Sequence, residues 1–227
     1  MIRETVNKIP GARRLAQLLG LVPLHGGRQF VLDMLPKGSI GAEIGVHLGD
    51  FSQRIIGTVS PKELHLIDPW EYQADDTYKT AWYGGGAKGG QRELDERHGR
   101  VLKRFRQHIR AGRVKVHRGY SAETLSQFPD GYLDWVYIDG NHLYRFIKQD
   151  LALSFRKVRP GGYITGDDYT EEGWWEGGVM KAVDEFAEKY AVRRVEIRNQ
   201  QFVFRKIHPR APHEAAAARA TYAQNLG

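Results

Sequence analysis

The 227-residue sequence contains no cysteine, and this absence excludes several kinds of chemistry. A chain without cysteine forms no disulfide bond, no thiolate metal site and no thiol nucleophile. The sequence also lacks a run of the roughly 18 consecutive apolar residues that a membrane span needs. Its first five residues carry no apolar core of a signal peptide. These absences predict a soluble, cytoplasmic protein with no membrane partner.

Acidic residues are fewer than basic ones, and the formal net charge is +7. Much of the excess lies between residues 97 and 118. A basic surface suits an anionic partner such as nucleic acid or a phosphorylated metabolite, whereas a solvated helix face explains the same pattern without a partner. Apolar residues (41%) and charged residues (27%) occur in ordinary proportions, which excludes a wholly disordered chain. The length fits one domain with a modest extension.

Short β-rich runs alternate with helical patterns through the middle of the chain, which is typical of a parallel sheet covered by helices. Apolar stripes at helical spacing begin at Leu94, Tyr144 and Val179. The predicted parallel strands are residues 40–46, 64–68, 114–118, 133–139 and 163–166. Two further runs, 192–197 and 202–207, predict a terminal antiparallel hairpin. The expected α/β fold therefore has five β/α units followed by a hairpin.

We expect the fold to occupy residues 39–208 as one domain. Three segments lie outside this domain or interrupt it. Residues 1–38 contain two helical patches and predict an N-terminal helical cap over the sheet or the active site. Residues 71–91 are rich in Gly, Tyr and Asp without periodicity, which is typical of a lid loop or a disordered segment. Residues 209–227 form an Ala-rich, helix-prone tail. The cap and the tail are candidate surfaces of a homodimer, which is the expected assembly.

A glycine turn follows the first strand, in the run Glu43-Ile44-Gly45-Val46-His47-Leu48-Gly49. Glycines at a strand-to-helix turn let the backbone approach a ligand, although they also serve helix–sheet packing. The second strand ends in Asp68, about 20 residues later, where a carboxylate reads ribose hydroxyls in nucleotide-binding folds. Ser121 and Ala122 follow the third strand, where Ser121 either caps a helix or meets a nucleoside base. A nucleoside-containing cofactor is one explanation of these residues, and turn packing and capping are the other.

Three carboxylates follow the fourth and fifth strands: Asp139 ends one, and Asp167 and Asp168 end the next. Because neighbouring parallel strands end at the same edge of a sheet, these side chains are expected to converge. Unpaired carboxylates repel one another, and a divalent cation such as Mg²⁺ (or Mn²⁺ or Ca²⁺) relieves that repulsion. The alternative is that they only form a turn and cap a helix.

His142 lies three residues beyond Asp139, near the start of a predicted helix. A helix N-terminus disfavours imidazolium, so a neutral ring that accepts a proton is expected there. A metal ligand or a simple helix cap are the alternatives. The aromatic residues Tyr169, Trp174 and Trp175 follow the acidic pair closely and form either a platform for a substrate or part of the core.

These residues resemble the class I S-adenosylmethionine-dependent methyltransferases, and among them the metal-dependent O-methyltransferases of the macrocin O-methyltransferase type. Catechol O-methyltransferase is more distantly similar. The resemblance spans roughly residues 30–207 and depends on these segments: Glu43-Ile44-Gly45-Val46, Leu66-Ile67-Asp68-Pro69-Trp70, Tyr137-Ile138-Asp139-Gly140-Asn141-His142, Gly166-Asp167-Asp168-Tyr169 and Gly178-Val179-Met180-Lys181-Ala182-Val183. It implies a Rossmann-like, mostly parallel seven-stranded sheet with an antiparallel C-terminal hairpin and helices on both faces.

The resemblance also implies roles for individual residues. Glu43 and Gly45 are expected to face the methionine part of S-adenosylmethionine, Asp68 its ribose, and Ser121 with Ala122 its adenine. Asp139, Asp167 and Asp168 are expected to hold Mg²⁺, and His142 is the candidate base. His47 stands where the wider superfamily has a second glycine, so the methionine end is expected to be bound differently, with His47 in the cofactor site. Residues 84–90 have no counterpart in the family pattern.

The expected activity is Mg²⁺-dependent O-methylation of a hydroxyl on a sugar or glycoside, with a small molecule or an oligosaccharide as substrate. A catechol or another phenol is the second candidate acceptor. An RNA methyltransferase or RNA-binding module that uses the basic helix is a third interpretation, which leaves the three carboxylates unexplained, so nucleic acid is not the expected partner. A catalytically inactive interaction subunit is disfavoured because the cofactor and metal positions all carry suitable side chains.

Overall fold

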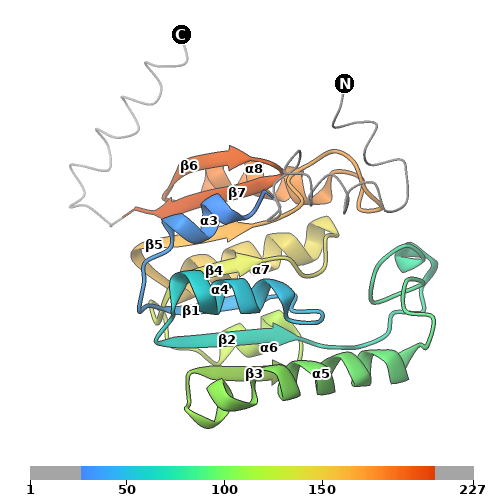
Figure 1. Cartoon of the computed structure of the whole chain (residues 1–227). Helices are drawn as coiled ribbons and strands as arrows, with labels where there is room; N and C mark the ends of the chain where they lie inside the picture. Colours follow the sequence, from blue (N-terminus) through green and yellow to red (C-terminus); the bar gives the residue numbers. More distant parts are fainter. Residues whose placement is uncertain (1–26, 208–227) are drawn as a thin grey trace, which may run out of the picture.

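The computed structural model describes residues 27–207, and these form a seven-stranded sheet with helices on both faces (Figure 1). The strand order is β3-β2-β1-β4-β5-β7-β6. The first five strands are parallel, β7 is antiparallel to β5, and β6 is antiparallel to β7. The strands are β1 Ile40–Ile44, β2 Glu63–Asp68, β3 Val114–Arg118, β4 Leu133–Ile138, β5 Val158–Gly166, β6 Val192–Arg198 and β7 Gln201–Lys206. This architecture confirms the fold expected from the sequence.

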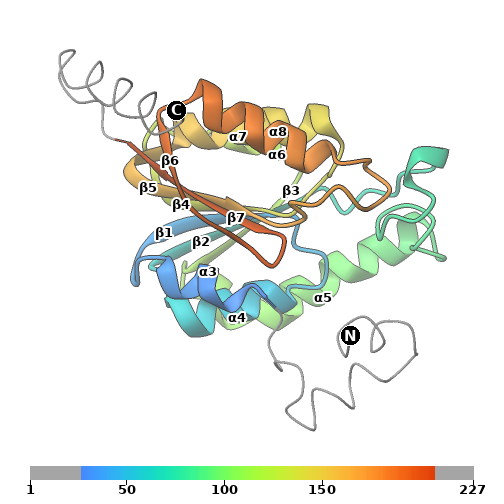
Figure 2. The same cartoon turned by 90° about the horizontal axis from the view of Figure 1, so that it is seen from above.

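The helices divide into two layers, one on each face of the sheet (Figure 2). One layer contains α3 (Gln29–Met34), α4 (Asp50–Val59) and α5 (Gln91–Arg110), and the other contains α6 (Ser121–Ser126), α7 (Tyr144–Lys157) and α8 (Gly178–Lys189). Each layer buries its own apolar cluster against the sheet. Alternate residues of the central strands supply both clusters, since Trp135 and Tyr137 belong to one and Val136 and Ile138 to the other. The α5 stripe predicted from Leu94 onward is buried through Leu94, Val101 and Phe105.

The register of the parallel strands brings their C-terminal ends to one level. Ile44 of β1 pairs with Ile67 of β2 and with Ile138 of β4, and Ile138 pairs with Gly166 of β5. The residues that follow these strands therefore stand in a row along one edge of the sheet. That row contains Gly45, Asp68, Asp139 and Asp167.

The hairpin between β6 and β7 turns through only two residues. Asn199 and Gln200 both have a positive φ, of 53° and 64°. Two left-handed residues in succession are the requirement of a type I′ turn, whose twist matches that of antiparallel strands. β5 begins at Val158, earlier than the predicted 163, because Val158 already pairs with Leu133 ahead of a register shift in β4.

The connection from β2 to α5 includes a short 3-10 helix, η1 (Asp76–Tyr78), and backbone hydrogen bonds tie the segment to itself. Tyr83 O accepts from the amide of Gln73, and Tyr78 O accepts from the amide of Gly85. The α3 helix occupies the second helical patch predicted for the N-terminal cap. The first patch, around residues 15–19, and the Ala-rich tail lie outside the described residues. Within residues 27–207, every helix is too short or too polar to cross a bilayer.

Candidate active site

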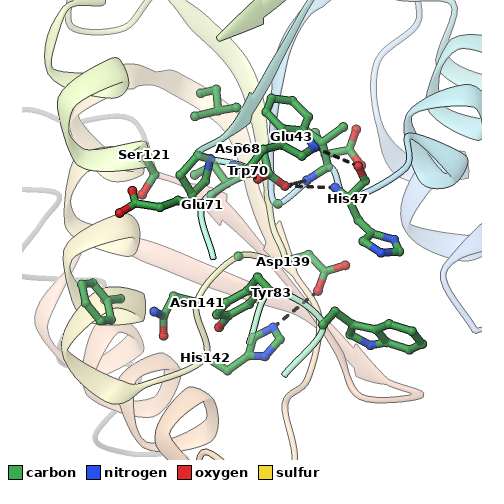
Figure 3. Close-up of a pocket in the computed structure, with 18 of the residues that line it drawn as sticks. Glu43, His47, Asp68, Trp70, Glu71, Tyr83, Ser121, Asp139, Asn141 and His142 are labelled. Carbon is green, nitrogen blue, oxygen red and sulfur yellow. Dashed lines mark hydrogen bonds and ion pairs between the residues drawn. The ribbon is translucent and has the colours of Figure 1, made fainter. Parts of the chain in front are cut away.

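A cavity of about 530 Å³ opens at the C-terminal edge of the central strands. This volume lies within the usual range for sites that take small molecules and cofactors. Figure 3 shows Asp68 and His47 on one side of the cavity and Asp139 and His142 on the other. The walls come from the residues that follow β1, β2, β3 and β4, from the 71–91 segment, and from the segment before α8.

The glycine turn after β1 packs closely against the residue that follows β4. Gly45 has a φ of 86°, and a Cβ at this position would overlap the backbone carbonyl of Asp139. Glycine is therefore required here by a left-handed backbone and by close packing of the β1 and β4 exits. His47 also has a positive φ, of 54°, in the place where the family pattern has a glycine.

The carboxylate of Asp68 organises this turn. Its Oδ2 accepts the backbone N–H groups of Val46 and His47 at 2.9 and 3.0 Å, and its Oδ1 accepts that of Trp70 at 2.7 Å. Burial raises the pKa of Asp68, and these backbone N–H donors act against that rise. The expected ribose ligand lines the cavity, but both of its oxygens already accept backbone hydrogen bonds.

Other polar groups line the nucleoside side of the cavity. Glu71 accepts a hydrogen bond of 2.7 Å from the Tyr120 hydroxyl at the cavity wall. Ser121 lines the cavity as the first residue of α6 and donates to the buried Asp150 of α7 at 2.6 Å, so it does not cap its own helix. Burial raises the pKa of Asp150 to about 7. Ala122, the other predicted adenine contact, does not line the cavity.

Glu43 lies at the floor of the cavity, within β1. Its side chain is buried and accepts a hydrogen bond of 2.5 Å from Ser52 of α4. Burial raises the pKa of Glu43 to about 8, and the hydrogen bond from Ser52 opposes that rise. A carboxyl that is this deeply buried supports the glycine turn and faces the same cavity as His47.

The three predicted carboxylates converge, but an arginine lies among them. Nη1 of Arg28, directly before α3, donates to Oδ2 of Asp139 at 2.7 Å, and Nη2 contacts Oδ2 of Asp167. Asp167 also accepts from Gln201 of β7, and it is buried behind the cavity wall. Burial and the neighbouring Asp139 raise the pKa of Asp167 to about 7. Asp139 and Asp168 line the cavity, whereas Asp167 does not.

His142 lies between the two carboxylates that face the cavity. Nε2 is 3.0 Å from Oδ2 of Asp168 and 3.5 Å from Oδ1 of Asp139. Both ring nitrogens are buried and have no well-aligned hydrogen-bond partner in the described part of the chain. Burial alone would lower the pKa of His142, but the adjacent Asp139 and Asp168 outweigh it and raise the pKa. One ligand atom each from Asp139, His142 and Asp168 lies within 4.8 Å of the others.

Aromatic side chains cover this acidic end of the cavity. Trp174 packs edge-on against Tyr78 of the 71–91 segment, with ring centroids 5.3 Å apart. The Trp175 ring lies 4.7 Å from that of His142. Both tryptophans line the cavity, and Trp175 also packs against the apolar cluster of the α7 and α8 layer. Tyr169 does not line the cavity, because its hydroxyl donates to Asp184 of α8 at 2.9 Å and the ring packs on the α8 side of the sheet.

The 71–91 segment supplies part of the cavity wall and is fastened to the acidic end. Thr80, Trp82 and Tyr83 line the cavity. Asn141, just after β4, donates to the hydroxyl of the buried Tyr78 at 3.0 Å. The Tyr83 hydroxyl is buried without a hydrogen-bond partner among residues 27–207. A ligand in the cavity would find this hydroxyl available.

Sequence reasoning missed Arg28, Glu71, Tyr83 and Asp150 as residues of the site. Glu71 stands only three residues after the strand-end Asp68, so the acid-rich end of β2 was the available signal. Asp150 lies in the middle of an amphipathic helix, where a buried acid breaks the pattern. Arg28 lies 111 residues from its partner Asp139, and no sequence signal links them.

Comparison with known proteins shows the family to which the chain belongs. A protein-family model described as a methyltransferase domain matches residues 42–169, more than half of the chain. Uncharacterized protein R132 of Acanthamoeba polyphaga mimivirus is 36% identical over 78 residues, which are 32% of this chain and 34% of that protein. The match thus spans about a third of that relative's length.

Two solved structures share the fold. The N-methyltransferase NodS from Bradyrhizobium japonicum WM9, in complex with S-adenosyl-L-homocysteine, has a TM-score of 0.55 and 14% identity, over 90% of this chain and 96% of that one. The O-methyltransferase NovP has a TM-score of 0.53 and 21% identity, over 78% of this chain and 75% of that one. At these identities the likeness concerns the fold alone.

The sheet order, the cavity at its C-terminal edge and the glycine turn define the class I methyltransferase fold. The chain belongs to the methyltransferase-domain family whose model matches it.

Proposed function

We propose that this protein is an S-adenosylmethionine-dependent, metal-assisted O-methyltransferase that acts on a hydroxyl of a sugar or glycoside, such as a polysaccharide precursor or a natural-product sugar. The observation that carries the proposal is the meeting of Asp139, Asp168 and His142 in the wall of the cavity. A hydroxyl must lose its proton during transfer, and a cation held by this cluster would lower the hydroxyl's pKa. The cluster therefore favours oxygen as the methyl acceptor.

The proposed methyl donor binds along the cavity wall that is formed by the residues at the C-terminal ends of β1, β2 and β3. Asp68 fixes the glycine turn, so the turn's backbone is held against the methionine part of the donor. Glu71 offers a carboxylate for the ribose hydroxyls, and Ser121 with Asp150 offers polar atoms for the adenine. The family match and the S-adenosyl-L-homocysteine bound to NodS, a protein of the same fold, support this donor.

The acidic cluster fits a divalent cation such as Mg²⁺. Carboxylate oxygens are the ligands that Mg²⁺ prefers, and the unpartnered ring nitrogens of His142 leave the cluster incompletely satisfied. Asp139 and Asp168 would hold the ion from the cavity side, and Asp167 would join them from behind. When bound, the cation supplies Lewis acidity that lowers the pKa of an acceptor hydroxyl.

The side chains of the site then perform three tasks. His142 takes the proton from the acceptor hydroxyl, and Asp139 stabilises the imidazolium that results. The C–O bond forms as the C–S bond of the sulfonium breaks, and the electron pair of that bond stays on sulfur. The aromatic walls at Tyr83 and Trp174 exclude water and hold oxygen, carbon and sulfur in line.

The end of the cavity beside the acidic cluster supports the proposed substrate class. Trp174 and Trp175 offer flat apolar faces beside the acidic cluster, which suits the apolar face of a sugar ring. A catechol would also present two neighbouring hydroxyls to the cluster and is the second candidate acceptor.

The test is consumption of the methyl donor over a panel of sugars, glycosides and catechols, with Mg²⁺ and with excess EDTA. We expect turnover with a sugar acceptor, its loss in EDTA, and its loss in Asp139→Ala with binding of S-adenosylhomocysteine retained. Asp130→Ala is the matched control, because Asp130 is an exposed carboxylate paired only with Arg156 and Lys157. Full activity in EDTA would contradict the metal requirement, and exclusive use of catechols would contradict the sugar acceptor.

The basic face of α5 favours a different candidate, an RNA methyltransferase. Its exposed residues include Arg92, Arg100, Lys103, Arg106 and Arg110, which recur at helical spacing along one side. A steep fall of RNA affinity with rising salt concentration, together with full activity in EDTA, would support that candidate over the first.

A further inference from the structure

Arg28 places a positive charge inside the acidic cluster that a metal would need. Its guanidinium bridges Asp139, which follows β4, and Asp167, which follows β5. A divalent cation shared by the same two carboxylates would join the same two strand ends. The arginine therefore does for these carboxylates what a cation would do, since it neutralises them and holds them together.

The position of Arg28 is built into the fold. Its guanidinium carbon lies 5.2 Å from the ring centroid of Phe51 and 5.8 Å from that of Tyr137. The side chain is 30% exposed and lines the cavity, so it reaches the cluster from the solvent side. A long side chain held mainly by its charged end can leave by rotation about its own bonds, without unfolding of the helix that follows it.

Two cations cannot share this place. A guanidinium and a divalent ion would compete for the same carboxylate lone pairs, and like charges a few ångströms apart repel strongly where water is excluded. Arg28 does not contact Asp168 or His142. These two residues therefore remain available to an incoming metal ion while Arg28 holds Asp139 and Asp167.

We propose that Arg28 is an internal counter-cation that competes with the divalent metal for Asp139 and Asp167 and is displaced when the metal binds. This inference rests on the metal requirement of the proposed function. Arg28 keeps the cluster assembled in the absence of metal and weakens the affinity for the ion. It acts on the metal site as a positioning residue and takes no part in proton or methyl transfer.

The test is Mn²⁺ binding to the full chain, measured by electron paramagnetic resonance and by calorimetry, in the wild type and in Arg28→Gln, Arg28→Lys and Arg54→Gln. We expect Arg28→Gln to bind Mn²⁺ at least about tenfold more tightly, a typical size for coupling between two ligands. Arg28→Lys retains the charge but not the two-pronged contact, so its affinity should fall between the two. Arg54 is the matched control: it also stacks on Phe51 but donates to Gln29 and not to the acids, so its replacement should change the affinity less than threefold.

The rise in unfolding temperature on adding Mn²⁺ provides a second readout, and a purely structural role of Arg28 would not change that rise. Without metal, Arg28→Gln should unfold at a lower temperature because the carboxylates then repel one another. Added Mn²⁺ should raise its unfolding temperature by more than it raises that of the wild type. Binding of S-adenosylhomocysteine checks that each variant is folded, and Arg28→Lys keeps the test valid if Arg28→Gln does not fold.

The outcomes separate this inference from the proposed function. Tighter Mn²⁺ binding in Arg28→Gln than in the wild type supports the competition. If Arg28→Gln binds Mn²⁺ and the wild type binds none, the competition is also supported, but the proposed metal requirement of the wild type is overturned. Equal or weaker binding in Arg28→Gln, with Mn²⁺ bound by the wild type, overturns the competition and leaves the metal requirement standing. Absence of Mn²⁺ binding in all variants overturns both.

Discussion

Both carboxylate oxygens of Asp68 accept backbone N–H groups, so at the scale of single residues this side chain shapes the glycine turn. Glu71, three residues later, is the carboxylate beside it that engages only the hydroxyl of Tyr120. Asp68 was expected to meet the ribose hydroxyls, and the structure shows its carboxylate bound to the backbone of the glycine turn. Asp68 supports the turn, and Glu71 is the better placed to meet a ligand.

Substitution of these two acids distinguishes the tasks. We expect Asp68→Asn to lower the free energy of unfolding by roughly 1–3 kcal/mol, because an amide presents only one acceptor oxygen to donors that need two. Glu71→Gln should change that free energy by less than about 0.5 kcal/mol and should weaken binding of S-adenosylhomocysteine. Urea denaturation and calorimetry measure the two effects. Equal loss of stability in both variants would contradict the division of tasks.

The motifs predicted the residues that follow the strands and missed those that reach the site from elsewhere. Gly45, Asp139 and Asp168 were predictable because the end of a parallel strand fixes where the next residue lies. Tyr169 was not, because its neighbour Asp168 has a φ of 60° and the chain turns there, so proximity in sequence did not place Tyr169 in the cavity. Arg28 was not predictable either, because its position depends on tertiary packing alone.

At the scale of elements, β2 and β3 are joined by more than their backbone ladder. Nδ1 of His65 lies 2.9 Å from Nε2 of His117 across the two strands, and Glu63 lies beside the other ring nitrogen of His65. Burial, and then the neighbouring His117, lower the pKa of His65 from 6.5 to about 4. Burial lowers the pKa of His117 as well.

This pair predicts a pH dependence of stability. Between pH 6.5 and about 4 the unfolded chain binds a proton at residue 65 that the folded chain does not. The free energy of unfolding should therefore fall as the pH decreases through this window, by up to about 3 kcal/mol from His65, and the His65 contribution is complete below about pH 4. Urea denaturation at a series of pH values measures the slope, and His65→Gln should flatten it. Parallel curves for wild type and variant would contradict this origin.

Asn141 holds the inner end of the 71–91 segment through its hydrogen bond to the Tyr78 hydroxyl, and Arg97 of α5 donates to Trp82 O at 2.7 Å. We expect Tyr78→Phe to increase hydrogen exchange across this segment, since the lost hydrogen bond is worth about 1 kcal/mol and the apolar ring remains. Tyr72→Phe is the control, because the Tyr72 ring packs on the core and its hydroxyl makes no hydrogen bond within residues 27–207. Unchanged exchange in Tyr78→Phe would show that this hydrogen bond does not hold the segment.

Most elements followed from periodicity, because strand and helix spacings differ and each buries a distinct face. The internal order of 71–91 could not be predicted, since its turns and its anchor at Asn141 leave no periodic pattern. The early start of β5 at Val158 was hidden by the Pro-Gly-Gly run that follows, which is typical of a turn.

At the scale of the whole molecule, the C-terminal hairpin completes the acidic cluster. Gln201 of β7 donates to Asp167 and accepts a hydrogen bond of 2.7 Å from the hydroxyl of Tyr137 in β4. Gln201 is 1% exposed, so bulk water does not reach Asp167 or Tyr137 to replace the hydrogen bonds that Gln201 makes. One side chain therefore links three strands of the sheet beneath the site.

Removal of this link should lower the stability of the folded protein. We expect Gln201→Ala to lower the free energy of unfolding by about 2–4 kcal/mol, because two buried polar groups lose their partner and a cavity remains. Gln107→Ala, on the exposed face of α5, should change it by less than about 0.5 kcal/mol. Denaturation measures both, and an effect of Gln201→Ala no larger than that of the control would contradict the linkage.

The two-residue turn at Asn199 and Gln200 also has a consequence for the order of events during synthesis. A ribosome delivers β1 to β5 well before β7, so a nascent chain can stack its central strands while Asp167 still lacks its amide donor. Asp167 gains this donor only when β7 pairs with β5, so the acidic cluster is completed by the last strand that the ribosome delivers.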